Sequence, residues 1–510
     1  AQHVFDDIHR QFQISPETLV ELTGQFLEEF KVGLGSYNRP MAMIPSFVTG
    51  VPDGTETGTF LALDLGGTNM RVCEVVLHGD TTFSLRQQKY KVSDALKTGE
   101  ASVLFDYLAD SVDAFLTSHP PSDEPASKQN PLDPTPDVVH LGLTFSFPVE
   151  QTALNSGKIL TWTKGFSAKH AIGNDVVKLL QDAFDRKHMH VKCVALVNDT
   201  VGALLSRAYT GGGCMLGAIF GTGTNGAYVE EVAKIKKLAN GSAASRGGIM
   251  VVNTEWGAFN NSRSHLPSTP FDNSMDRLSI NPRFQAFEKM ISGMYLGEIT
   301  RNILLSLMDA APKSLLFGGA TTAAMNAQWG FDTSVISAIE EAWEGDDAGK
   351  EDRENHAPQL SAFDAPEKLN PAVKGRLARV RAVIVKELAF KEEDVSLRDA
   401  AIVKWASSMV ARRAALLSGV AVATVLIQTG RAVLSGQAGK PTKNEPKIGV
   451  GQLIYFLYSL IQFYPHFEET LRESLRIVVG AEVEKRVDIG LAKDGSGVGA
   501  ALCALQAAKE

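Results

Sequence analysis

One pattern occurs twice in this chain of 510 residues, and it limits the possible folds more than any other feature. LALDLGGTNMRVCEV (residues 61–75) and GAIFGTGTNGAYVEE (residues 217–231) each read as a strand, a turn of Gly, Thr and Asn, and a second strand. A repeated strand–turn–strand unit indicates two similar halves. Strands that alternate with helices around each copy predict α/β layers. We therefore expect two related lobes with a cleft between them, and ligands at the carboxyl ends of the strands.

Strands and helices are expected to alternate in both halves of the chain. In the first half, the predicted strands are residues 59–65, 70–77, 82–92, 138–145 and 191–197, and the predicted helices are 103–116, 174–184 and one from about 199. In the second half, the predicted strands are residues 214–220, 226–232, 249–253, 447–450 and 487–491, and the predicted helices are 281–308, 366–387, 396–429, 467–478 and 498–505. Residues 118–137 and 343–365 are polar and are expected to be loops.

The composition is that of a globular protein with room for two or more domains. The formal net charge of -8 argues against nonspecific nucleic-acid binding, which needs a positive surface. Residues 1–10 are polar and include acids, so no signal peptide is recognised and a cytoplasmic location is expected. The cysteines are scattered without a CxxC pair, and are expected to be buried free thiols: Cys73, Cys193, Cys214 and Cys503.

Two apolar runs raise the question of a membrane segment. Residues 414–427 and 452–464 are both shorter than the ~20 residues that a membrane-spanning helix needs. The first run continues a helical pattern that starts at Ser396, where Asp399 completes a capping box. We expect that run to be a buried core helix and expect no membrane association.

The first glycine-rich turn, DLGGTN, covers Asp64 to Asn69. Two glycines after a strand let the backbone approach a phosphate closely and offer N–H donors. Asp64 could hold Mg²⁺ directly or through water. An ordinary hairpin turn is the alternative. The stretch is not a GxxxxGK[ST] loop, since it has no lysine at the required place.

The second turn, FGTGTNG, covers Phe220 to Gly226 and repeats the device in the other half. Two such turns facing each other would clamp a polyphosphate. Between them, LVNDTVGALL ends a predicted strand in Asn198 and Asp199. A carboxylate at that place is a natural general base, but Asp199 could equally be the N-cap of the helix that follows.

Four further residues are candidates for a polar ligand. Lys164 lies in TWTKGF, and Ser146 lies between aromatic residues in TFSFP, a pattern that suits the apolar faces and polar edges of a sugar ring. Glu255 in NTEWG and Glu288 in QAFEKM can each accept hydrogen bonds from neighbouring hydroxyls. Solvated surface positions are the alternative for Lys164 and Glu288.

Taken together, these motifs resemble the eukaryotic hexokinase family, in order along nearly the whole chain. The matching stretches are residues 64–71, 144–148, 162–166, 197–202, 220–226, 253–257, 285–298 and 494–501. The stretch PFDNSMDRLSINPRFQAFEKMISGMYLGEI looks most like the fungal glucokinase branch. The resemblance implies an α/β, two-lobed, actin-like (ribonuclease H-like) ATPase fold with a duplicated core and an interlobe cleft.

The resemblance also implies a reaction: ATP-dependent phosphorylation of glucose, or of other hexoses, at the 6-hydroxyl, as the first step of glycolysis. Asp199 matches the general base, and Arg71 and Lys164 are candidates for neutralising charge in the transition state. The sugar-contacting positions match Ser146, Thr163, Lys164, Asn198, Asp199, Asn225, Glu255 and Glu288. The phosphate-binding positions match Asp64, Gly66, Gly67, Thr68, Asn69, Gly221, Thr222 and Gly223. Mg²⁺ is expected to be held mainly through ATP and water, and no protein metal site is expected.

One motif departs from the family pattern. On the adenosine side the family reads like Gly-Val-Asp-Gly-Ser-Leu, followed by Tyr-Pro-x-Phe. Here Gly449 and Val450 match the start, and the end matches too, but GQLIYFLY, from Gly451 to Tyr458, stands where Asp-Gly is expected. The interruption leaves open a catalytically impaired glucose sensor as the alternative function. An actin-like structural or chaperone ATPase is a third reading, which the paired Glu255 and Glu288 disfavour.

We expect a small lobe of residues 55–199 plus 482–510, and a large lobe of residues 1–54 plus 200–481. Glucose and ATP are the expected partners. The sequence does not decide among glucose, mannose and fructose, nor does it fix the oligomeric state.

Overall fold

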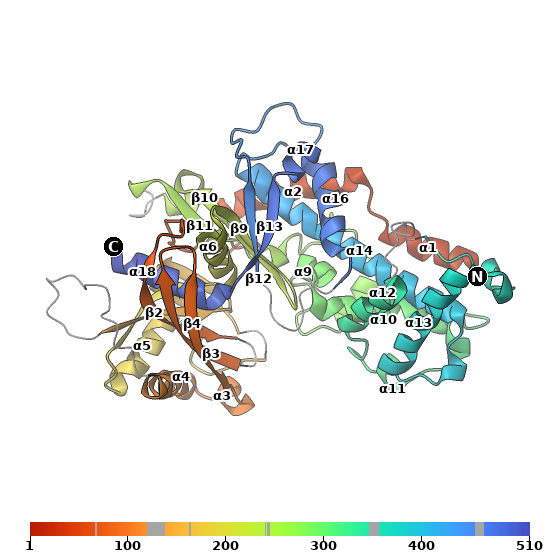
Figure 1. The fold of residues 1–510 in the computed structure, drawn as a ribbon, viewed down its shortest axis with the longest axis horizontal. Coiled ribbons are helices and arrows are strands. Elements are labelled where there is room, and N and C mark those ends of the chain that lie inside the picture. Colours follow the sequence, from red (N-terminus) through yellow and green to blue (C-terminus); the bar gives the residue numbers. More distant parts are fainter. Residues whose placement is uncertain are drawn as a thin grey trace.

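The computed structural model describes residues 1–66, 69–119, 138–162, 165–239, 241, 245–345, 356–453 and 464–509. Within these ranges the strands form sheets of five and six strands and a two-stranded hairpin. Figure 1 shows an elongated molecule, with the five-stranded sheet at one end, the six-stranded sheet in the middle and a block of helices at the other end.

The five-stranded sheet has the order β4-β3-β2-β5-β8. Its first three strands are antiparallel, and β5 and β8 run parallel to β2. Their bounds are β2 Thr57–Leu65, β3 Asn69–His78, β4 Phe83–Lys91, β5 Val139–Phe145 and β8 Val191–Val197. Alternate β2 side chains face opposite ways, as the two-residue period of a strand requires. Leu61 and Leu63 pack with α4 (Ala101–Ser118) and α5 (Val176–Arg186), and Phe60 and Ala62 pack with α6 (Asp199–Gly211) and α18 (Gly495–Lys509).

The six-stranded sheet repeats this arrangement. Its order is β1-β11-β10-β9-β12-β13, with β9, β10 and β11 antiparallel and with β12 and β13 parallel to β9. The bounds are β1 Ile44–Pro45, β9 Cys214–Phe220, β10 Thr224–Glu231, β11 Ile249–Asn253, β12 Ile448–Leu453 and β13 Val487–Ala492. Apart from β1, both sheets therefore have the same order and strand directions. The duplicated α/β core predicted from the repeat is confirmed.

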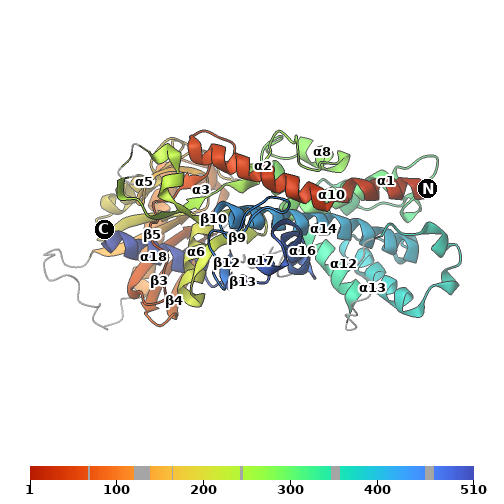
Figure 2. The same cartoon turned by 90° about the horizontal axis from the view of Figure 1, so that it is seen from above.

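The long apolar helix is a core helix, as predicted. It is α14, Leu397–Gln428, and it begins in a capping box in which Ser396 and Asp399 each bond the other's backbone N–H. Among the described residues it is the one helix long and apolar enough to cross a membrane, and 89% of its most apolar window is buried. Figure 2 shows α1 (Gln2–Phe12) and α2 (Pro16–Gly35) lying along it.

The remaining helices differ from the sequence prediction in one functionally relevant place. Residues 281–308 do not form one helix, because Ser292 is extended and divides α9 from α10. The prediction of a helix over 366–387 is too long, since α13 begins at Pro371. The other helices are α3 Asp94–Thr98, α8 Pro270–Arg277, α9 Ala286–Ile291, α10 Gly293–Met308, α11 Ala323–Asn326, α12 Thr333–Glu344, α13 Pro371–Glu387, α16 Phe467–Val479 and α17 Ala481–Glu484.

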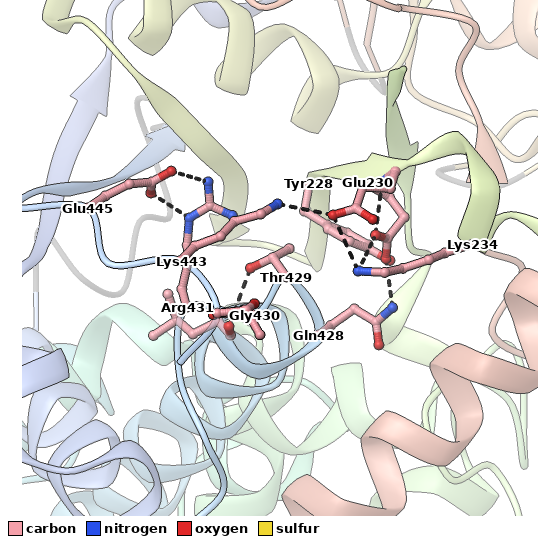
Figure 3. Close-up of polar contacts among 12 residues, drawn as sticks. Tyr228, Glu230, Lys234, Gln428, Thr429, Gly430, Arg431, Lys443 and Glu445 are labelled. Carbon is pink, nitrogen blue, oxygen red and sulfur yellow. Dashed lines mark hydrogen bonds and ion pairs between the residues drawn. The ribbon is translucent and has the colours of Figure 1, made fainter. Parts of the chain in front are cut away.

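A polar network fixes the segment that leads from α14 to β12 (Figure 3). Arg431 binds Glu445 through two nitrogens at 2.7 and 2.8 Å. The buried Glu230 of β10 accepts hydrogen bonds from Tyr228 at 2.9 Å and from Gln428 at 2.6 Å. Because buried carboxylates are stable only with such partners, this network joins the end of α14 to strand β10.

Strand β12 is longer than predicted and bears on the interrupted motif. It runs to Leu453, and Gly451 and Gln452 pair with both β13 and β9. The first residues of the interruption therefore continue a central strand, while residues 454–458 lie outside the described residues.

The lobe boundaries stay a prediction, and the sheet pairing differs from them in one place. Residues 482–510 are assigned to the small lobe, but β13 belongs to the six-stranded sheet through its pairing with β12. Helix α18 packs on the five-stranded sheet. The C-terminal segment thus reaches both sheets.

Candidate active site

The first glycine-rich turn joins β2 to β3. Asp64 is buried near the end of β2, and Asn69 begins β3. The backbone N–H of Gly66 donates to the carbonyl oxygen of Asn69 at 3.1 Å, which closes the turn. Gly67 and Thr68, two predicted phosphate-binding residues, lie outside the described residues.

Arg71 of β3 lies between two carboxylates. Its Nη2 donates to Asp64 Oδ2 at 2.9 Å and to Asp494 Oδ1 at 3.2 Å, and Ser496 Oγ donates to Asp64 Oδ2 at 2.8 Å. Burial disfavours the charged guanidinium, but the attraction of Asp64 and Asp494 outweighs it and raises the pKa of Arg71. Arg71 therefore stays charged and joins the end of β2 to the start of α18.

Glycines allow helix α18 to pack closely against β5 and α6, beside Arg71. A Cβ on Gly142 of β5 would lie 2.3 Å from the carbonyl oxygen of Ala500. A Cβ on Gly202 of α6 would lie 2.4 Å from that of Gly495, and one on Gly499 would lie 2.2 Å from the Cα of Gly202. Only residues without a side chain allow such close backbone approach, so the start of α18 is fixed against β5 and α6.

The N-cap position of α6, which the sequence left open for Asp199, is occupied by its neighbour Asn198. Asn198 is the cap, because its Oδ1 accepts from the backbone N–H of Thr200 at 2.9 Å. Asp199 is the first helical residue, two positions after the end of β8, and its Oδ1 accepts from the same N–H at 2.9 Å. The side chain of Asp199 is 7% exposed. Asn198 is therefore the N-cap, and both side chains accept from the same first-turn N–H.

The second glycine-rich turn joins β9 to β10 and is hydrogen-bonded to the start of α10, just after the helix break at Ser292. The N–H of Gly293 donates to the carbonyl oxygen of Gly221 at 2.7 Å, and that of Met294 donates to Thr222 at 3.2 Å. The first N–H groups of a helix have no partner inside the helix, and here the turn supplies it. The start of α10 therefore fixes the position of the turn.

Glu288 reaches the second turn from α9. Its Oε2 accepts from the N–H of Thr224 at 3.0 Å, and a Cβ on Gly223 would lie 2.7 Å from the same oxygen. Gly223 therefore makes room for this carboxylate.

Asn225 and Glu255 lie in one hydrogen-bonded group, whose third member, Asn253, was not a sequence candidate. Asn225 Nδ2 donates to Asn253 Oδ1 at 2.8 Å, and Asn253 Nδ2 donates to Glu255 Oε1 at 2.8 Å. Gln285 was not a sequence candidate either. In the structure it lies against Gly257, where an added Cβ would be 2.3 Å from Gln285 Oε1. The sequence signal that could have identified Asn253 and Gln285 was an amide residue two or three positions before an acidic candidate, Glu255 or Glu288.

The predicted site residues thus form two groups, one at the strand ends of each sheet. Ser146 follows β5, and Asn198 and Asp199 follow β8. In the second group, Asn225 lies at the start of β10, Glu255 follows β11, and Glu288 lies on α9, which packs on β10. Thr163 and Lys164 lie outside the described residues.

The aromatic residues around Ser146 have a different role from the sugar platform that the sequence suggested. Phe145 and Phe147 are buried, and Phe147 packs edge-on against Trp162 and Phe166, with ring centroids 5.0 and 4.9 Å apart. They form part of the core of the first half.

Within the described ranges, no group of three or more His, Cys, Asp or Glu residues could hold a metal ion. Asp64, in the first turn, and Asp494 are both paired with Arg71. Oxygen ligands of this kind fit Mg²⁺ that arrives with phosphate and keeps its water shell.

Comparison with known proteins connects this geometry with one family. Two hexokinase family models match residues 4–209 and 215–506. A glucokinase of Aspergillus niger is 39% identical over 99% of this chain and 96% of its own length, and glucokinase-1 of Saccharomyces cerevisiae is 38% identical over 98% and 96%. The solved hexokinase of Schistosoma mansoni in complex with glucose aligns with a TM-score of 0.76 and 32% identity over 99% of this chain and 98% of that one.

These matches confirm the two-lobed, actin-like α/β fold expected from the sequence. They cover the chain almost from end to end and include both halves of the duplicated core. The chain therefore belongs to the hexokinase family and is a phosphotransferase of the hexokinase and glucokinase type.

Proposed function

We propose that this chain transfers the terminal phosphoryl group of ATP to the 6-hydroxyl of glucose, with Asp199 as the general base. The observation that carries the assignment is the buried carboxylate of Asp199 at the end of β8, beside a helix cap that Asn198 already supplies. The hydroxyl oxygen bonds to the γ-phosphorus, and the bond from that phosphorus to the bridging oxygen of ADP breaks. The hydroxyl proton passes to Asp199.

The sugar is proposed to lie between the two groups of polar residues. Ser146 and Asn198 would contact it from the first sheet, and Asn225, Glu255 and Glu288 from the second. Carboxylate pairs suit a hexose because each can accept from two hydroxyls. Thr163 and Lys164 complete the proposed set.

ATP is proposed to lie between the two glycine-rich turns. Backbone N–H groups of the first turn, Asp64 to Asn69, and of the second, Gly221 to Gly223, would bind its phosphates. Mg²⁺ bound with ATP neutralises phosphate charge, and Asp64 and Asp494 would hold its water ligands. Arg71 and Lys164 would offset the charge that develops during transfer.

The test of the base is Asp199→Asn, which keeps the shape of the side chain and removes the charge. Turnover should fall roughly 10²-fold or more, the scale of a positioned base, while glucose binding measured by calorimetry is retained. Asp182→Asn, at a half-exposed aspartate paired with Lys178 on α5, is the matched control. Normal turnover of Asp199→Asn would refute the role.

The alternative of an impaired glucose sensor depends on the interruption from Gly451 to Tyr458, and nothing in the comparisons favours it. We would compare glucose-dependent ADP production by the chain and by a variant in which those residues are replaced by Asp-Gly. Turnover by both would show that phosphoryl transfer tolerates the segment from Gly451 to Tyr458. Turnover by the variant alone, with glucose still bound by the original, would support the sensor. ATP hydrolysis without any sugar would support the actin-like ATPase.

A cytoplasmic location is also proposed, in keeping with a sugar kinase that draws on ATP. Imaging of a fluorescent fusion in cells tests it, and a signal confined to an organelle would contradict it.

A further inference from the structure

The loop that leads into α9 has an unusual construction. Residues 278–285 connect α8 to α9, which carries Glu288. The loop holds two residues with left-handed backbone, Arg283 (φ 67°) and Gln285 (φ 55°). Such conformations of residues other than glycine cost of order 1–3 kcal/mol each and persist only where the surroundings enforce them.

Apolar burial does not enforce this loop. Ile280 is 90% exposed and Phe284 is 64% exposed. The restraint must come from polar contacts beneath the loop.

Those contacts converge on one buried ammonium. Lys289 follows Glu288 on α9 and is only 2% exposed. Its Nζ donates to Asp276 Oδ1 at 2.7 Å, to Ser279 Oγ at 2.9 Å and to the carbonyl oxygen of Asn281 at 2.7 Å. All three donors of the ammonium are therefore used on the loop and on the end of α8.

Asp276 completes the anchor. Its carboxylate also pairs with Arg263 at 2.5 Å and accepts the backbone N–H of Arg283 at 3.1 Å. Although burial opposes the charge, the bonds from Lys289 and Arg263 lower the pKa of Asp276. Removing one partner of such a pair leaves the other charge buried and unpaired, so the loop and the end of α8 depend on Lys289 for their contacts.

The loop ends where the proposed sugar site begins. The N–H of Ala286 donates to Asn261 Oδ1 at 3.1 Å, and Gln285 fits against Gly257. Glu288 then reaches the N–H of Thr224. The direction in which Glu288 leaves α9 is thus set by the loop that Lys289 holds.

We infer that Lys289 is a positioning residue for sugar binding, a buried ammonium that holds Glu288 in place through Asp276 and the loop 278–285. The inference rests on the proposed role of Glu288. It assigns to Lys289 no contact with sugar or ATP.

The test is Lys289→Met, which keeps a long side chain and removes the charge. The KM for glucose should rise tenfold or more, the scale of a lost hydrogen bond to a charged group, while the KM for ATP stays within twofold. Ser279→Ala removes one partner of the ammonium and should raise the KM for glucose in the same direction by a smaller factor. That milder variant decides the matter if Lys289→Met does not fold.

Arg301→Met is the matched control, because Arg301 forms another buried ion pair in the same half, with Glu298 of α10. It should lower the melting temperature without changing the KM for glucose. A melting temperature lowered by Lys289→Met with an unchanged KM for glucose would overturn the inference, as would a parallel rise in both KM values.

Glu288→Gln separates the inference from the proposed function. A raised KM for glucose in Glu288→Gln with an unchanged KM in Lys289→Met and Ser279→Ala overturns the inference alone. An unchanged KM in Glu288→Gln overturns both the role of Glu288 and the inference. Absence of glucose phosphorylation by the wild-type chain would refute the proposed function itself.

Discussion

Replacing Gly202 by alanine should damage the active site without touching any residue proposed to bind substrate. Gly202 lies on α6, three positions after Asp199, where the helix crosses the start of α18. Its new Cβ would lie 2.4 Å from the carbonyl oxygen of Gly495, and an ordinary contact needs at least 3.4 Å. The two helices must therefore separate by about 1 Å.

This displacement sets the expected size of the effect. Overpacking of this kind costs about 1–3 kcal/mol, and the gain of up to about 1 kcal/mol from alanine in a helix offsets only part of it. The catalytic effect should be larger, because the start of α6 carries Asp199 and the start of α18 holds Arg71 through Asp494. A misplacement of about 1 Å can cost roughly 10²-fold in rate.

Thermal unfolding and a coupled assay for ADP measure the two effects. Gly375→Ala on α13 is the matched control, since nothing lies within 4 Å of its new Cβ. It should keep full turnover and raise the melting temperature slightly. Wild-type turnover and stability in Gly202→Ala would show that the helices do not approach as described, and would refute the reasoning.

Two further predictions concern titratable groups. Burial lowers the pKa of Lys237 to about 8, although its Nζ donates to the carbonyl oxygens of Gly33 and Ala42. The unfolded chain binds more protons between pH 8 and 10.5, so the wild type should gain stability relative to Lys237→Met as the pH rises through this window. Equal pH profiles in urea unfolding would contradict this. Burial raises the pKa of each of the four cysteine thiols to about 12, so Ellman's reagent at pH 8 should react quickly only after denaturation. Rapid reaction of the native protein would show that the thiols are accessible.

Sequence reasoning recovered the fold where local pattern and tertiary structure agree. The repeated strand–turn–strand unit, the capping box at Ser396 and the strands of both sheets other than the two-residue β1 follow from side-chain periods and turn residues. Helix α2 was missed although Ser15 and Pro16 mark its start. The break at Ser292 could not be predicted, because it depends on hydrogen bonds from Gly293 and Met294 to a distant turn.

The site was predictable in its types of residue and less so in its pairings. Asn198 and Asp199 both had the chemistry of an N-cap, and only the backbone geometry shows that Asn198 takes that role. Arg71 stands out as a cation beside the first turn, but its partner Asp494 lies 423 positions away in the chain. No local pattern encodes a contact of that length. The close approach of Gly202 to Gly495 has the same origin.

The contacts of helix α6 explain how both halves of the duplicated fold position the carboxylate of Asp199. On one side it meets α18 through Gly202, and on another it meets β9, where a Cβ on Gly217 would lie 2.2 Å from the carbonyl oxygen of Thr200. Near its end, Arg207 pairs with Asp488 of β13 at 2.5 Å. Because these backbone contacts leave no room for adjustment, the helix cannot shift relative to one sheet without disturbing the other. The position of Asp199 is therefore a property of the whole packing around α6, and Gly202 and Gly217 should be as sensitive to substitution as residues that contact substrate.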